Sequence, residues 1–199
     1  MADLNVALLG FVGVLVGGYS NNFLAEDYRR FRDGQALAGA LAGELESHAE
    51  AIPTIKDGLE KMLMGLGQGE KLTLKEWPVP ASPLFDDNAS KIGLLGAQSA
   101  RDVAYVYENI RAFRQSFHML SKNHADVPAM WSQGMLISCL AAIERAENRG
   151  QSLIENLRRY AVESYWQRSQ TRTQLKWGAA GFIVFLILLR LFSLGTISQ

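Results

Sequence analysis

The sequence contains few of the residues that carry covalent or metal chemistry. A single cysteine, Cys139, excludes a disulfide within the chain, suits a reducing compartment and lies in a helical pattern that predicts a core residue. Neither His118 nor His124 has a cysteine or a second histidine at the spacing of a zinc site. The Glu44 and His48 pair lacks the further glutamates of a di-iron bundle. We therefore expect no bound metal.

Catalytic signatures are absent as well. The chain has no phosphate-binding glycine loop, no G-x-S-x-G nucleophile motif and no H-E-x-x-H motif. Its 20 basic and 20 acidic side chains balance, which argues against a nucleic-acid partner. Because acids are interspersed among them, basic residues such as Arg111 and Arg114 are expected on solvated helix faces. We expect no catalytic residue, no cofactor and no enzymatic activity.

Proline is scarce, which favours long helices. Only five prolines are present, and three of them, Pro78, Pro80 and Pro83, fall in one short window. Proline interrupts helices, so the rest of the chain is largely free to form them. Pro53 is the exception, because it lies inside a helical pattern that we expect it to kink or split.

Two long apolar stretches stand at the ends of the chain. Residues 177–194 are the most apolar part of the sequence, and residues 4–24 carry no charged side chain. Such stretches predict membrane-spanning helices, which we place at residues 1–24 and 177–195. The first stretch lacks a basic start and a cleavage site, so we expect it to be an uncleaved anchor rather than a signal peptide.

The basic residues beside these stretches predict the orientation. They gather on the side of each stretch that faces the middle of the chain: Arg29, Arg30, Arg32, Arg168, Arg172 and Lys176. Lysine and arginine prefer the cytoplasmic side of a membrane. We therefore expect both termini outside and a cytoplasmic body over residues 25–176.

Small residues and one charge within the apolar stretches are candidate functional positions. Glycine lets membrane helices pack closely, although membrane helices are also rich in glycine in general. Five glycines occupy such positions: Gly10, Gly13, Gly17, Gly178 and Gly181. Arg190 lies about 20 Å into the second stretch, where an ionisable residue is a functional candidate. The simpler interpretation, which we favour, is that its side chain extends to the outer interface.

The region between the stretches has the apolar spacing of packed helices. Apolar residues recur at alternating steps of three and four, which is a heptad pattern. The expected helices cover about 25–67, 97–122 and 129–176, the last running on into the second membrane helix. The first and third are both about 70 Å long, and the first leaves the membrane whereas the third returns to it. This predicts an all-α, antiparallel three-helix bundle standing on two transmembrane helices. A heptad seam can pack within one chain or against another copy of it, so the pattern is compatible with both a monomer and a homo-oligomer.

The loop over residues 68–96 is the least regular part of the body. It must carry the chain back towards the bilayer, with a short helix near its end whose Phe85 faces inward. Loops of this length are often functional. We therefore take Trp77, Pro78, Pro80 and Phe85 as a candidate docking loop.

One resemblance adds a location. An N-terminal anchor, an arginine cluster and the Ala/Leu/Glu-rich helix over 36–48 occur here in that order, followed by the segment FDDNASKIGLLGAQSARDVAYVYENI over 85–110. This arrangement resembles uncharacterised bacterial inner-membrane proteins. The resemblance implies a bacterial inner membrane and carries over no functional residue.

The sequence favours one function and leaves two alternatives. We expect a non-enzymatic, membrane-anchored helical scaffold or adaptor that contacts the lipid bilayer and binds an unknown protein partner through its cytoplasmic bundle. One alternative is a small membrane-active or pore-forming protein that oligomerises through Gly13 and Gly17. The other is a membrane sensor with a ligand pocket near the bilayer, which requires convergent polar groups that the sequence does not reveal.

Overall fold

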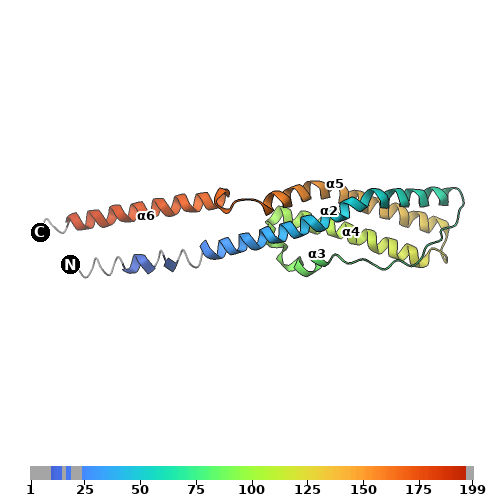
Figure 1. The fold of residues 1–199 in the computed structure, drawn as a ribbon, viewed down its shortest axis with the longest axis horizontal. Helices are drawn as coiled ribbons and strands as arrows, with labels where there is room; N and C mark the ends of the chain where they lie inside the picture. The colour runs from blue at the N-terminus through green and yellow to red at the C-terminus, as the bar shows by residue number, and fades with distance from the viewer. Residues whose placement is uncertain (1–9, 15–16, 19–23, 196–199) are drawn as a thin grey trace. The chain divides into compact units, whose positions relative to one another are not determined.

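The computed structural model describes residues 10–14, 17–18 and 24–195, with the backbone alone for residues 170, 175, 184–186 and 188–195. In this described part the regular structure is entirely helical, without a strand, which confirms the all-α prediction. The chain divides into two units, residues 1–161 and 162–199. A helical bundle makes up the first unit (Figure 1).

The bundle begins with a long helix, α2 (Ala25–Gly67), which contains Pro53. Proline has no N–H, so the carbonyl of Ala49 loses its usual helical donor and a bend is expected there. The helix bends and does not split, since α2 continues through Pro53 and its axis turns partway along (Figure 1). It stops where Gly69 adopts the left-handed φ of 84° and Glu70 N donates to Gly65 O at 3.0 Å.

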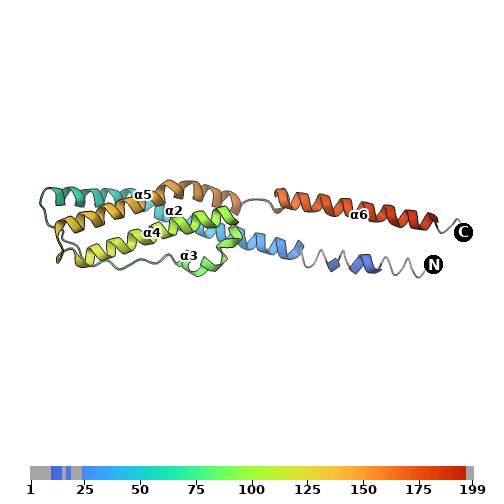
Figure 2. The same cartoon turned by 180° about the vertical axis from the view of Figure 1, so that it is seen from behind.

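Two short helices and one extended segment follow. Residues 70–82, which we call the strap, have no regular structure and return along the bundle (Figures 1 and 2). The strap leads into α3 (Pro83–Asn88), with proline at its first turn, and then the 3-10 helix η2 (Ala89–Leu95). These two helices stand where the sequence pattern indicated a short helix.

The remaining helices of the bundle are α4 (Ala97–Asn123) and α5 (Ala129–Ala161). Helix α5 packs against both α2 and α4. Side-chain pairs give the directions of the helices. From α2, Glu46 pairs with Arg158 of α5, and Lys56, further along α2, pairs with Glu147, which is earlier in α5. From α4, Asp102 pairs with Arg149 of α5, and Asn109, further along α4, pairs with Arg145. Helices α2 and α4 therefore run in one direction and α5 in the other.

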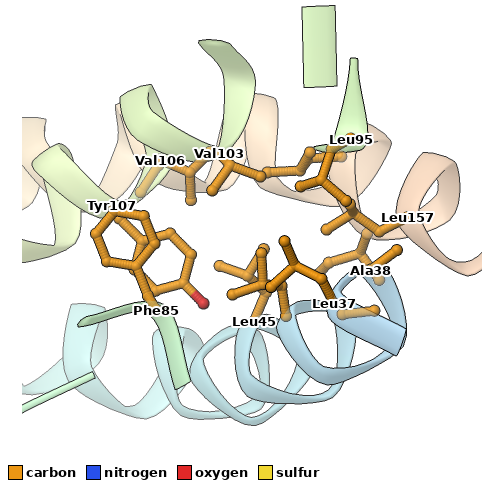
Figure 3. Packing of buried hydrophobic residues seen from close by; sticks show 14 residues of the cluster. Leu37, Ala38, Leu45, Phe85, Leu95, Val103, Val106, Tyr107 and Leu157 are labelled. Carbon is orange, nitrogen blue, oxygen red and sulfur yellow. The ribbon is translucent and has the colours of Figure 1, made fainter. Parts of the chain in front are cut away.

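The interior of the bundle consists of two apolar clusters. The first is drawn in Figure 3 and contains Leu37, Ala38, Leu41, Ala42, Leu45, Phe85, Leu95, Val103, Val106, Tyr107, Ala146, Leu153, Ile154 and Leu157. The second contains Leu59, Leu66, Leu120, Leu136, Cys139 and Ile143. Both clusters draw on the predicted heptad positions, so the seams close within a single chain here.

The expectation of one unbroken helix over residues 129–176 is wrong. Helix α5 ends at Ala161, and a short 3-10 helix, η3 (Tyr165–Gln167), precedes α6 (Ser169–Gly195). The Nε2 amide of Gln35 donates to the carbonyl oxygens of Tyr160 at 3.3 Å and Ala161 at 3.1 Å. Carbonyl groups at the end of a helix lack an N–H donor from a following turn, and Gln35 supplies a donor from another helix.

The two predicted transmembrane helices lie at the ends of the chain, at residues 1–24 and 177–195. Helix α6 covers residues 177–195 as one helix. Among the residues that the structure describes, no helix combines the length and the apolar character needed to cross a membrane. Most of residues 1–24 and the side chain of Arg190 lie outside the described part. The two membrane helices and the position of Arg190 stay predictions.

Two neighbouring residues of α5 provide a matched test of the bundle. Leu136 is fully buried, whereas 56% of Ile137 is exposed. We expect Leu136→Ala to lower the free energy of unfolding by about 2–5 kcal/mol, because it removes buried methyl groups and leaves a cavity. Ile137→Ala should change it by less than about 0.5 kcal/mol. Thermal and urea unfolding of the full-length chain, followed by circular dichroism, measures both; equal effects would contradict this packing.

Candidate functional site

A cavity of about 180 Å³ lies between α2, α4 and α5, and we call it the central cleft. Residues of both apolar clusters line it, so it marks the place where the two clusters meet. Its apolar walls include Ile52, Ile55, Ile110, Phe113, Ile143 and Ile154.

Small residues account for the open space. Ala49 and Ala51 of α2 and Ala146 and Gly150 of α5 all line the central cleft. A Cβ atom built on Gly150 would meet no other atom within 4 Å. Close-packed interiors leave few voids of this size, so the alanines and the glycine leave room that larger side chains would fill.

Two basic side chains meet at the edge of the central cleft. His48 on α2 and Arg114 on α4 both line it, with Arg114 Nη2 3.4 Å from His48 Nε2. A guanidinium group only donates hydrogen bonds, so His48 Nε2 is the acceptor and its proton is on Nδ1. Burial and the nearby Arg114 lower the pKa of His48, although Glu44 raises it somewhat. His48 is therefore uncharged at neutral pH, and Arg114 supplies the positive charge.

The expectation that Arg114 lies on a solvated helix face is wrong. Its side chain is half-buried and donates from Nη1 to the buried Ser82 Oγ at 2.7 Å. In the described part of the chain, no carboxylate oxygen lies within 4.0 Å of its guanidinium group. Burial lowers the pKa of Arg114. Arg111 does lie on an exposed face, where it pairs with Glu108 at 2.6 Å and Asp86 at 3.5 Å.

Arg114 also faces a second cavity of about 240 Å³, which lies under the end of the strap. We call it the strap pocket. Its walls come from the strap, α3 and α4, and include Pro80, Ser82, Asp86 and Arg111. Arg114 thus lies between two cavities, one largely apolar and one largely polar.

A carboxylate on α2 holds α3 in place. Glu44 accepts hydrogen bonds from the backbone N–H groups of Leu84 and Phe85, each at 3.1 Å, and from the hydroxyl of Tyr107 at 2.6 Å. Helix α3 has no side-chain cap of its own, so Glu44 takes that role from another helix. With three donors on its oxygens, Glu44 does not pair directly with Arg114.

The aromatic rings beside Glu44 reinforce this junction. Phe85 of α3 stacks on Tyr107 of α4 with ring centroids 4.0 Å apart and an interplanar angle of 9°, and the two rings lie together in Figure 3. Burial and the hydrogen bond to Glu44 raise the pKa of Tyr107 well above its ordinary value. The tyrosine hydroxyl therefore stays protonated and remains a donor to Glu44.

Polar side chains of α4 fasten the strap. Trp77 N donates to Ser121 Oγ at 3.0 Å, and its carbonyl oxygen lies 2.6 Å from His118 Nδ1. Leu74 N donates to His124 Nε2 at 3.2 Å. The strap has no helix or strand of its own, so these side chains satisfy backbone groups that secondary structure would otherwise pair.

The structure separates the residues of the candidate docking loop. Trp77 is 54% exposed and touches Phe117 edge to face, and Pro78 is also exposed. Pro80 lines the strap pocket. Phe85 is only 7% exposed, as its inward position predicted, so it anchors the segment and offers no surface to a partner. A docking role for the exposed residues stays a prediction.

The other candidate positions from the sequence are distributed along the chain. A Cβ atom built on any of the glycines at 10, 13, 17, 178 and 181 would meet no atom within 4 Å, and their role in packing membrane helices stays a prediction. Cys139 is buried in the second cluster, and burial raises its pKa to about 12, so the thiol stays protonated. Within the described residues, no group of histidine, cysteine and acidic side chains could hold a metal.

Sequence reasoning did not assemble the residues of this site. Glu44 and His48 are one turn apart on α2, and Arg114 is two turns beyond Tyr107 on α4, so each pair shares a helix face. This spacing was a usable signal. What joins the two faces is the return of the strap and α3 across them, and no local pattern shows that contact.

Comparison of the chain with protein-family models, curated proteins and solved structures found no match. The proposals that follow therefore depend on the residues and geometry of this chain.

Replacing Glu44 tests the junction. We expect Glu44→Ala to lower the free energy of unfolding by about 1–3 kcal/mol, because the N–H groups of Leu84 and Phe85 and the Tyr107 hydroxyl lose their acceptor. Amide hydrogen exchange should rise at residues 84 and 85. The control is Glu46→Ala, which breaks the partly exposed pair with Arg158 and should leave those amides protected. Equal exchange in the two variants would refute the capping role.

The lowered pKa of His48 makes stability depend on pH. The ordinary value is 6.5. Below it the unfolded chain takes up the proton more readily than the folded chain, so stability is complete above that pH and is lost as pH falls. We expect unfolding midpoints to drop between pH 7.5 and 5.5 by more in the wild type than in His48→Gln, which still offers Arg114 an acceptor. Equal drops would exclude His48 as the cause.

Proposed function

We propose that the protein is a non-enzymatic, membrane-anchored helical adaptor of the bacterial inner membrane. Its termini lie outside, its bundle lies in the cytoplasm, and it binds a protein partner through that bundle. The lipid bilayer holds it by the two apolar ends of the chain.

The observation that carries this proposal is that the chain enters and leaves the bundle at one end. Near the start of α2, Phe31 meets Tyr160, near the end of α5, with ring centroids 5.7 Å apart. The hydrogen bonds from Gln35 to the last carbonyls of α5 lie at the same end. A two-pass protein requires a chain that enters and leaves its bundle at one end, so this geometry of α2 and α5 supports the proposal.

The described side chains of α6 support the second anchor. Trp177 is 75% exposed, Phe182 50%, Ile183 56% and Ile187 53%. Consecutive positions 182 and 183 point in different directions around a helix, so the exposed apolar surface is not confined to one stripe. Exposed apolar side chains on more than one side of a helix need lipid or protein to cover them.

The strap supports partner binding. It presents Trp77, 54% exposed, and Val79, 47% exposed, on a segment fixed by α4. Tryptophan is enriched at protein interfaces because it offers a large contact area at little entropic cost. A fixed loop also loses little entropy on binding.

Photo-crosslinking in living bacterial cells tests both parts of the proposal. A photoreactive amino acid replaces Val79 in the strap or, as the control, the exposed Ile137 of α5. Membranes are then washed with alkaline carbonate before purification of the full-length chain. We expect the chain to stay in the membrane fraction and Val79, but not Ile137, to give one discrete product with a different protein.

Three results would contradict the proposal. Extraction of the chain by carbonate would refute membrane anchoring. Products that contain only copies of this chain would refute an adaptor and would favour self-association. Equal yields from both positions would refute binding through the strap.

A further inference from the structure

We propose that the central cleft binds a small amphiphilic carboxylate, whose apolar body fills the cleft and whose carboxylate pairs with Arg114. This site depends neither on the membrane placement nor on the protein partner proposed above. It goes beyond an adaptor role, because it gives the bundle a small-molecule ligand.

The size and lining of the cleft define the apolar body. An engineered apolar cavity of about 150 Å³ binds benzene, and the central cleft measures about 180 Å³. It therefore suits one ring or a short chain of about six to ten carbons. Five isoleucines and Phe113 form much of the apolar wall, and the space beside Gly150 is empty.

The charges around the cleft select an anion. Arg114 is half-buried, and no carboxylate in the described part of the chain lies within 4.0 Å of it. The charges of Glu44 and Asp86 act on Arg114 from farther away, but neither forms an ion pair with it. A half-buried charge without a direct ion-pair partner is costly, so a ligand carboxylate offsets part of that cost. Glu147, the acidic residue of the lining, is paired with Lys56 at 3.0 Å. Glu44 is occupied by its own donors.

His48 lies beside Arg114 at the edge of the central cleft, and its pKa should show whether the site is filled. Its Nε2 accepts from Arg114, which holds the guanidinium group at the cleft edge. Arg114 contributes to the lowered pKa of His48. A carboxylate bound beside Arg114 would cancel part of that positive field, so the pKa of His48 should rise when the site is filled.

The strap pocket is the competing location for an anion at Arg114. Its other charged lining residues, Asp86 and Arg111, already pair with each other at 3.5 Å. More polar than apolar surface lines it, so it suits an apolar body less well than the central cleft does. A ligand that needs both an apolar wall and a positive charge finds the two together at the central cleft.

The probe for the test is 4-fluorobenzoate, with uncharged 4-fluorobenzyl alcohol as its matched control. Both are titrated by ¹⁹F NMR against the full-length chain in phosphatidylcholine nanodiscs, with empty nanodiscs as the blank. We expect saturable binding of the carboxylate and binding of the alcohol weaker by roughly ten- to a hundredfold, because the alcohol lacks the charge-assisted bonds to Arg114. The NMR titration curve of His48 should shift to higher pH with the carboxylate.

Four variants locate the site. Arg114→Gln should weaken 4-fluorobenzoate binding by roughly ten- to a hundredfold, and Arg114→Lys should retain part of it. Arg111→Gln, on the same helix but lining only the strap pocket, should bind like the wild type. Ala51 is exposed at the cleft, so Ala51→Trp should obstruct it with little risk to folding and weaken binding. Thermal unfolding confirms that each variant is folded.

Three comparisons between probes and variants would overturn the proposal. The first is equal affinity for the carboxylate and the alcohol. The second is full binding by folded Arg114→Gln. The last is loss of binding in Arg111→Gln while Ala51→Trp still binds like the wild type. The last would place the anion in the strap pocket. Absence of saturable binding to the wild type would also refute the site and leave the cleft as a packing void.

Discussion

The carboxylate of Glu44 is the interaction on which the arrangement of this bundle depends. It joins α2, which carries it, to the start of α3 and to Tyr107 of α4. Because α2 and α4 run in the same direction, the chain must return along the bundle between them. Glu44 fixes the place where that return changes from the extended strap to short helices.

The same interaction explains why Arg114 is left without an acidic partner. Glu44 is the acid whose charge acts most strongly on Arg114, but its oxygens accept from two backbone groups and a tyrosine. Ser82, at the end of the strap, takes one donor of Arg114 and covers it. The result is a half-buried positive charge between an apolar and a polar cavity. The contacts of Arg114 with Ser82 and His48 bring three polar side chains together, which the sequence alone did not show.

Local patterns were sufficient for the helices. Heptad spacing placed the three long helices, and the inward positions of Phe85 and Cys139 followed from the same spacing. The end of α5 was missed, because neither glycine nor proline marks it. The residue that completes it, Gln35, is 126 positions from Ala161 in the sequence.

Arg114 was misjudged for a related reason. It was expected on a solvated face because acids are interspersed among the basic residues, whereas Ser82 of the strap and His48 of α2 both contact it. A strap fastened by side chains has no periodic pattern, so its path could not be inferred from spacing. The site is thus made of residues that helical periodicity orders correctly within each helix but cannot bring together between helices.

A double-mutant cycle between Glu44 and Tyr107 tests this account most directly. The free energy of unfolding is measured for the full-length wild type, Glu44→Gln, Tyr107→Phe and the double variant. If the carboxylate and the hydroxyl bond as described, the two changes should be coupled by about 1 kcal/mol or more. Additive effects, within about 0.3–0.5 kcal/mol, would contradict the contact that organises the bundle.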